Sequence, residues 1–111
     1  MKPSKMSDHA PVGSFEEQVM LAVIRTGAEA YGMSVRRELE QVTGRDVTIG
    51  SVYITLDRLE AKGLVASTRT PGRGDAPSRR VFAVTPRGVH ALADTRRIRE
   101  RLWAGVELKL V

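Results

Sequence analysis

The stretch TIGSVYITLDRLEAKGLV, residues 48–65, decides the fold of this chain. Its apolar residues recur at the spacing of one face of an α-helix. Those residues are Ile49, Val52, Leu56 and Leu59. Thr48 precedes them and is typical of an N-cap residue, and Gly63 stands where the helix should end. The stretch therefore predicts a helix with one buried face.

The opposite face of this predicted helix is unusual for a surface that meets only water. Ser51, Ile54 and Arg58 point away from the apolar side. A hydroxyl and a guanidinium can hydrogen-bond to base edges or phosphates, and an aliphatic side chain can contact a thymine methyl group. The face therefore indicates contact with DNA if the neighbouring elements form a suitable fold.

Two shorter helices are predicted before this stretch. Ser14 and Glu17 have the spacing of a capping box, and the apolar run that follows predicts a helix ending near Gly27. A second helix is predicted over residues 32–43, with Gly44 just beyond its C-terminus. Its apolar residues are Met33, Val35, Leu39 and Val42.

After Gly63 the pattern changes from helix to strand. The segments LVASTRT (64–70) and SRRVFAVT (78–85) are rich in β-branched and aromatic residues. The prolines and glycines of PGRGDAP, between them, indicate a loop, so the two segments predict a β-hairpin. Thr85 and Pro86 then suit the N-cap and first position of a helix that we expect to run to about Leu108.

This order of elements predicts a mostly α fold with a small antiparallel hairpin. Three helices, a two-stranded wing and a long last helix are the layout of a winged helix-turn-helix domain with a C-terminal extension. We expect a flexible N-terminal arm over residues 1–13, the DNA-binding domain over 14–85, and a dimerisation helix over 86–111.

Charge divides the chain unevenly. Residues 1–65 carry eight Lys and Arg against nine Asp and Glu, whereas residues 66–101 carry nine Arg against three acidic residues. The basic second part favours an anionic partner, and nucleic acid is the first candidate. A solvated arginine-rich surface is the alternative.

The sequence resembles the PadR family of bacterial transcription regulators, in particular its shorter members with a single C-terminal helix. The resemblance lies in SFEEQVMLAVI, AYGMSVRREL, GSVYITLDRLEAKGLV and RRVFAVTPRG, from about residue 14 to residue 93. Its most specific residues are Tyr31-Gly32, followed by Gly50, Tyr53, Leu56, Leu59 and Gly63-Leu64-Val65. One departure is in the second wing strand, where the family usually has two aromatic residues and this chain has Val81-Phe82.

The resemblance implies a homodimeric repressor that binds a near-palindromic operator in double-stranded DNA. Some members release DNA when they bind a small aromatic molecule, so such an effector is an expected partner here. We expect no cofactor or metal, and the lack of cysteine suits a cytoplasmic location. Membrane partners are not expected, since no apolar run approaches the ~20 residues that a bilayer requires.

We expect the DNA contacts to come from the third helix and the wing. The predicted contact residues are Thr48, Ser51, Tyr53, Ile54, Thr55 and Arg58 on the helix, and Arg73, Arg79 and Arg80 on the wing. Three of the helix residues have an alternative role: Thr48 as a cap alone, Tyr53 as a core residue, and Arg58 as a local ion-pair partner. The wing arginines would then form a solvated basic hairpin.

The last helix carries an apolar stripe that a small three-helix core cannot cover. Its predicted interface residues are Leu92, Ile98, Leu102, Trp103 and Val106. Trp103 has two interpretations, a residue of the dimer core or the wall of a ligand pocket between two subunits.

Other function classes have less support. The chain has no cysteine, and its two histidines, His9 and His90, lack neighbouring acidic residues at ligand or triad spacing. An enzyme is therefore not expected. A winged-helix adaptor that binds protein instead of DNA remains as the second hypothesis.

Overall fold

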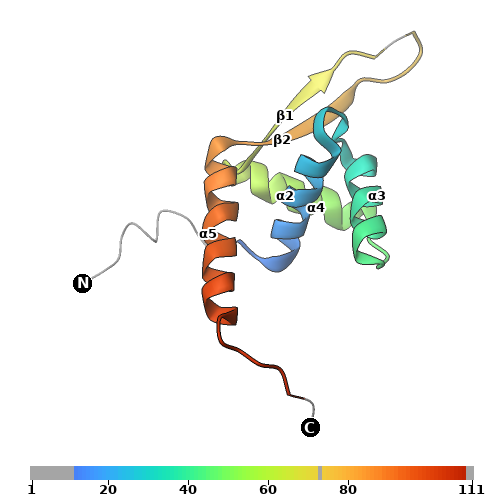
Figure 1. Cartoon of the computed structure of the whole chain (residues 1–111). Helices are drawn as coiled ribbons and strands as arrows, with labels where there is room; N and C mark the ends of the chain where they lie inside the picture. The colour runs from blue at the N-terminus through green and yellow to red at the C-terminus, as the bar shows by residue number, and fades with distance from the viewer. Residues whose placement is uncertain (1–11, 73, 110–111) are drawn as a thin grey trace.

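The computed structural model describes residues 12–72 and 74–109 of the chain (Figure 1). Residues 1–11 of the expected N-terminal arm, Arg73 of the wing tip and residues 110–111 lie outside the described residues. The elements are α2 (Ser14–Thr26), a 3-10 turn η1 (Gly27–Glu29), α3 (Gly32–Thr43), α4 (Ile49–Ala61), β1 (Val65–Thr70), β2 (Arg79–Val84) and α5 (Pro86–Trp103). This is the predicted mostly α fold with a small antiparallel hairpin.

Helices α2, α3 and α4 pack against one another around the core of the domain. Each contributes side chains that are almost fully buried, and these include Val19, Met20, Val23, Val35, Leu39, Val52, Leu56 and Leu59. Burying an aliphatic side chain of this size contributes roughly 1.5–3 kcal/mol. Because α4 uses only its inner face for this packing, its outer face is free to contact another molecule.

The helix ends were predicted with unequal success. Thr48 caps α4 as expected, since its Oγ1 accepts a hydrogen bond of 3.1 Å from the Ser51 N–H. Gly44 follows α3 with a left-handed backbone at φ 71°, also as expected. The capping box of α2, however, was placed one residue too late: Gly13 is the N-cap, and its N–H donates to Oε1 of Glu16 at 3.2 Å.

The hairpin is anchored to the start of α3 by a short extended segment. Strands β1 and β2 pair in antiparallel register from Val65↔Val84 to Thr70↔Arg79. The N–H of Phe82, a buried residue of β2, donates to the carbonyl of Ala30 at 2.8 Å, and Tyr31 forms a β-bridge with Val81. The base of the wing is therefore fixed relative to α3, while the hairpin extends away from the helices (Figure 1).

Helix α5 begins close to the end of β2. The Thr85 hydroxyl accepts from the Gly88 N–H at 3.0 Å and donates to the Gly63 carbonyl at 2.7 Å. A Cβ on Gly88 would lie 2.1 Å from the Leu64 carbonyl oxygen, so only glycine allows this close approach. The first turns of α5 are thereby held against the domain.

The end of α5 differs from the prediction. The helix stops at Trp103 and not near Leu108, so Val106 lies in an irregular C-terminal segment. Gly105 adopts φ 76°, a left-handed conformation that interrupts a helix and that glycine favours. Among the described residues, none of the helices combines the length and the apolar composition needed to cross a bilayer.

Candidate nucleic-acid interface

The outer face of α4 carries small and apolar residues at its centre and a basic residue at one edge. Ile54 is 55% exposed, and Arg58, one turn further along the helix, is also exposed. At Gly50 an added Cβ would meet nothing within 4 Å, so the fold itself does not require glycine there. Ser51 is half-buried and donates its hydroxyl to the Thr48 carbonyl at 2.8 Å, which leaves its oxygen as an acceptor.

Thr55 was predicted on this face, and that prediction is wrong. The residue is only 6% exposed. It lies three residues after Val52 and four before Leu59, and this spacing places it on the buried side of the helix. A small hydroxyl is compatible with either side, so its type did not reveal its position.

Arg58 makes no ion pair within the described residues, so the local pairing considered for it does not occur. Its positive charge acts on the carboxylate of Glu16 on α2. Burial raises the pKa of Glu16. The hydrogen bonds from Lys62 and the Gly13 N–H, together with the charges of Lys62 and Arg58, outweigh burial and leave this pKa below its usual value. The guanidinium of Arg58 therefore remains available to an external partner.

Arg80 has a different environment from the one expected of a phosphate contact. Its guanidinium forms an ion pair of 3.0 Å with Asp57 and a second one with Glu60, both on α4. Its Nε also donates to the Ser67 hydroxyl at 3.2 Å, and that hydroxyl donates to Glu60 at 2.8 Å. Because two carboxylates already compensate its charge, we assign Arg80 to fastening the wing onto α4.

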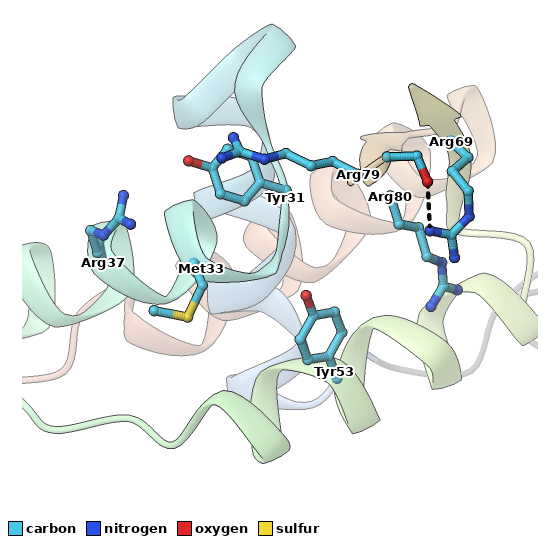
Figure 2. A pocket seen from close by; sticks show the side chains of 8 residues that line it. Tyr31, Met33, Arg37, Tyr53, Arg69, Arg79 and Arg80 are labelled. Carbon is cyan, nitrogen blue, oxygen red and sulfur yellow. Dashed lines mark hydrogen bonds between the residues drawn. The ribbon is translucent and has the colours of Figure 1, made fainter. Parts of the chain in front are cut away.

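A groove of about 480 Å³ opens between the start of α3, one edge of α4 and the hairpin (Figure 2). Four of its lining residues are arginines and none is acidic. The lining consists of Tyr31, Met33, Arg37, Tyr53, Arg69, Ser78, Arg79 and Arg80. Arg79 lies with its guanidinium carbon 4.1 Å from the centre of the Tyr31 ring, a cation–π arrangement.

Tyr53 lies at the boundary between the packed and the exposed sides of α4. Its side chain covers Gly32 so closely that a Cβ there would lie 2.3 Å from the hydroxyl oxygen. The residue is nevertheless 38% exposed and lines the groove (Figure 2). The packing of Tyr53 on Gly32 gives a physical reason for the joint presence of Tyr31-Gly32 and Tyr53 in the sequence.

Sequence reasoning missed the contributions of Arg37, Arg69 and Tyr31 to this surface. Arg37 lies one turn after Met33, and Tyr31 precedes α3 by one residue, so the start of α3 supplies three lining residues. The helical spacing of Met33 and Arg37 was visible in the sequence. The bridge between Tyr31 and Val81, which brings α3 to the wing, was not.

Only part of the predicted dimer interface is accessible. Leu92 is 8% exposed and belongs to the core of its own domain, so it is not available to a partner and its prediction is wrong. The other predicted residues are exposed: Ile98 by 45%, Leu102 by 72%, Trp103 by 54% and Val106 by 51%.

Comparison with known proteins identifies the family. Residues 20–94 match the transcriptional regulator PadR-like family. The chain belongs to this family. PadR-like proteins are transcriptional regulators and not enzymes.

A relative of this chain is also named a transcriptional regulator. Transcriptional regulator Rv3488 of Mycobacterium tuberculosis is 42% identical over 74 residues, which cover 67% of this chain and 66% of that protein. The match therefore spans just under two thirds of that relative's length.

Solved structures share the PadR-like fold. A complex structure of hsRosR-S4 aligns with a TM-score of 0.68 and 27% identity over 91% of this chain and 82% of that one. A PadR-like transcription factor from Bacteroides fragilis aligns with a TM-score of 0.70 and 22% identity over 89% and 88%. A PadR family regulator from Eggerthella lenta gives 0.69 and 24% over 92% and 86%.

Proposed function

We propose that this PadR-like regulator is a homodimeric repressor that recognises a near-palindromic operator through α4. The observation that carries the proposal is the outer face of α4, which exposes Ile54 and Arg58 and has a residue without a side chain at Gly50. Such a face suits the major groove, where sequence is read by hydrogen bonds and methyl contacts.

Within the major groove the residues of α4 have separate roles. Ile54 contacts a thymine methyl group, and Arg58 donates to a base edge or a neighbouring phosphate. Gly50 lets the helix backbone approach the DNA closely. Ser51 offers its oxygen as an acceptor, and the start of α4 at Thr48 presents backbone N–H groups to a phosphate.

The wing contacts the DNA backbone beside this site. Arg79 is held against Tyr31 and lines the basic groove, so its charge is already positioned for a phosphate. The expected contact from Arg73 at the wing tip stays a prediction, since this residue lies outside the described part of the chain.

The last turns of α5 form the centre of the dimer interface. Gly88, Ala91 and Leu92 are buried on one face of this helix, and Ile98 and Leu102 continue that face as exposed residues. Figure 1 shows the C-terminal end of α5 extending beyond the neighbouring helices. A second copy that covers this continuation would bury the stripe on both subunits around a two-fold axis.

Helix α2 extends this apolar surface. Leu21 and Ile24 are 42% and 49% exposed and share a face of α2 with Glu17. Glu17 accepts a hydrogen bond of 2.6 Å from Arg99 of α5, which links the two helices at this point. We infer that the partner subunit packs on both helices.

The proposal includes repression by the DNA-bound dimer and its release by a small aromatic effector. A dimer bound across a promoter excludes other proteins from that DNA. Trp103 lies on the last turn of α5 and is half-exposed beside Leu102, so an aromatic effector that stacked on it would act at the subunit interface.

The experiment that tests the proposal is selection of genomic fragments by the purified protein, followed by footprinting of the tightest fragment. We expect two related half-sites whose centres are separated by about one helical turn, roughly 34–36 Å, or a multiple of it. Binding without any preferred fragment would contradict sequence-specific repression. No DNA binding at all would favour the adaptor.

A further inference from the structure

We infer that the basic groove between α3, α4 and the wing is a binding site for a backbone phosphate of double-stranded DNA. Arg37 and Arg69 would bind this phosphate beside Arg79. The inference rests on the proposed function and extends the contact surface to Arg37 of α3 and Arg69 of β1, neither of which is among the predicted contact residues.

Charge is the first argument for a phosphate in this groove. Its lining contains no carboxylate, and among its arginines only Arg80 forms an ion pair with another described residue. Arg37 has neither a hydrogen bond nor an ion pair within the described residues. Arg69 donates only to the Ser78 hydroxyl, at 3.4 Å. Uncompensated positive charge in a concave surface attracts an anion, and guanidinium groups suit the oxygens of a phosphate.

Shape is the second argument, and it favours a polymer over a small molecule. Six of the lining residues are exposed, and only Tyr31 and Arg80 are half-buried. A small ligand normally has most of its surface buried by its site. This groove is a trough on the surface, which suits one phosphodiester of a strand that continues past both ends.

Position is the third argument. Tyr53 and Ile54 are consecutive on α4, so their side chains lie about 100° apart around the helix axis. If Ile54 faces the bases, Tyr53 faces the strand that borders the major groove. Its hydroxyl lies on the side toward Gly32 of α3, where it can donate to a phosphate oxygen (Figure 2).

Preorganisation is the fourth argument. Tyr31 is held by its bridge to Val81, and it orients the Arg79 guanidinium by the 4.1 Å stacking contact. Arg80 fastens the wing to α4 without contributing free charge. The groove is therefore formed before DNA arrives, and binding does not have to order its walls.

The test is the salt dependence of binding to the selected operator and to a scrambled duplex, for full-length Arg37→Ala and Arg69→Ala. Both residues are exposed, so the variants should fold, which circular dichroism checks. We expect each to weaken both duplexes by about tenfold, because a hydrogen bond to a charged group is lost. Each should also reduce the slope of log K against log salt by about 0.9. Arg101→Ala is the matched control, since it removes an exposed arginine of α5, a helix that contributes no residue to the groove.

Three results would overturn the inference. If the wild type binds DNA and both variants keep its salt slope, the groove holds no phosphate. If Arg101→Ala flattens the slope equally, net charge accounts for the effect. If inorganic pyrophosphate saturates the wild type but not Arg37→Ala, in a thermal-shift titration at submillimolar concentration, the groove is a site for a small anion. A wild type that binds no duplex would instead remove the proposed function itself.

Discussion

At the scale of single residues, Gly50 separates the needs of folding from those of DNA binding. Its φ is not in the left-handed region, and an added Cβ would meet no atom within 4 Å. Gly50→Ala should therefore stabilise α4 by roughly 0.5–1 kcal/mol, because alanine has the higher helix propensity.

The same substitution should weaken DNA binding. An added methyl group between α4 and the floor of the major groove would push the helix away from the bases. This should reduce the free energy of DNA binding by about 1–3 kcal/mol. Thermal unfolding and operator binding of the same preparation check both effects. A variant that is more stable and binds with unchanged affinity would show that Gly50 does not face the bases.

The sequence predicted whether a side chain is exposed only where helical spacing alone determined its position. Ile54 is an apolar residue off the apolar stripe, and its exposed position followed from helical spacing alone. Thr55 and Leu92 were placed on functional surfaces although both are buried. Threonine occurs in both buried and exposed positions. Leu92 lies on the apolar stripe of α5, and how much of this stripe the rest of the domain buries depends on packing between distant segments, which no local pattern reveals.

At the scale of elements, the contact between α4 and the wing depends on Glu60. Hydrogen bonds from Ser67 and then Arg80 hold the pKa of Glu60 below its usual value. The folded protein therefore binds this proton less readily than the unfolded chain does. The resulting stability is fully present above the usual carboxyl pKa and is lost as pH falls through the lower, folded-state pKa.

Glu60→Gln should consequently lower the melting temperature near pH 7, and its deficit relative to the wild type should shrink below about pH 4. Thermal unfolding from pH 7 to pH 3 measures this. Glu29→Gln is the control, since the Glu29 side chain is exposed and has no ion pair within the described residues. A deficit that stayed constant with pH would argue that the network stabilises the wing through packing and not through charge.

Element order and type followed from the sequence, whereas element ends followed only in part. Thr48, Gly44 and Thr85 were recognised because each end depends on one local side chain or on glycine. The end of α5 was misplaced because the apolar residues Val106 and Leu108 continue the pattern after the helix has stopped at Trp103. The link between Tyr31 and the wing joins distant segments, so no local pattern could reveal it.

At the scale of the whole molecule, the account requires two copies of the chain. Leu102→Asp should yield monomers, because it would bury an unpaired carboxylate at the proposed interface, which costs several kcal/mol. Operator affinity should fall with it, since each monomer reads a single half-site. Light scattering measures the mass, and a dimer that persisted would place the interface elsewhere.

The matched control is Ala93→Asp, which adds the same charge to an exposed position on a different face of α5. It should leave the dimer intact. Trp103 provides a second signal, because it is the only tryptophan and lies at the proposed interface. The emission maximum of Trp103 should shift to longer wavelength when the wild type is diluted. In Leu102→Asp it should lie at this longer wavelength before any dilution.

In the proposed complex, α4 reads the operator sequence and the wing contacts the phosphate backbone. The most direct measurement is the affinity of Arg58→Ala, Ile54→Ala and Arg79→Ala for the selected operator and for a scrambled duplex of equal length. The α4 variants should lose about 1–3 kcal/mol of preference for the operator. Arg79→Ala should weaken both duplexes equally. If both α4 variants kept the wild-type preference for the operator over the scrambled duplex while Arg79→Ala lost it, the roles proposed for α4 and the wing would be wrong.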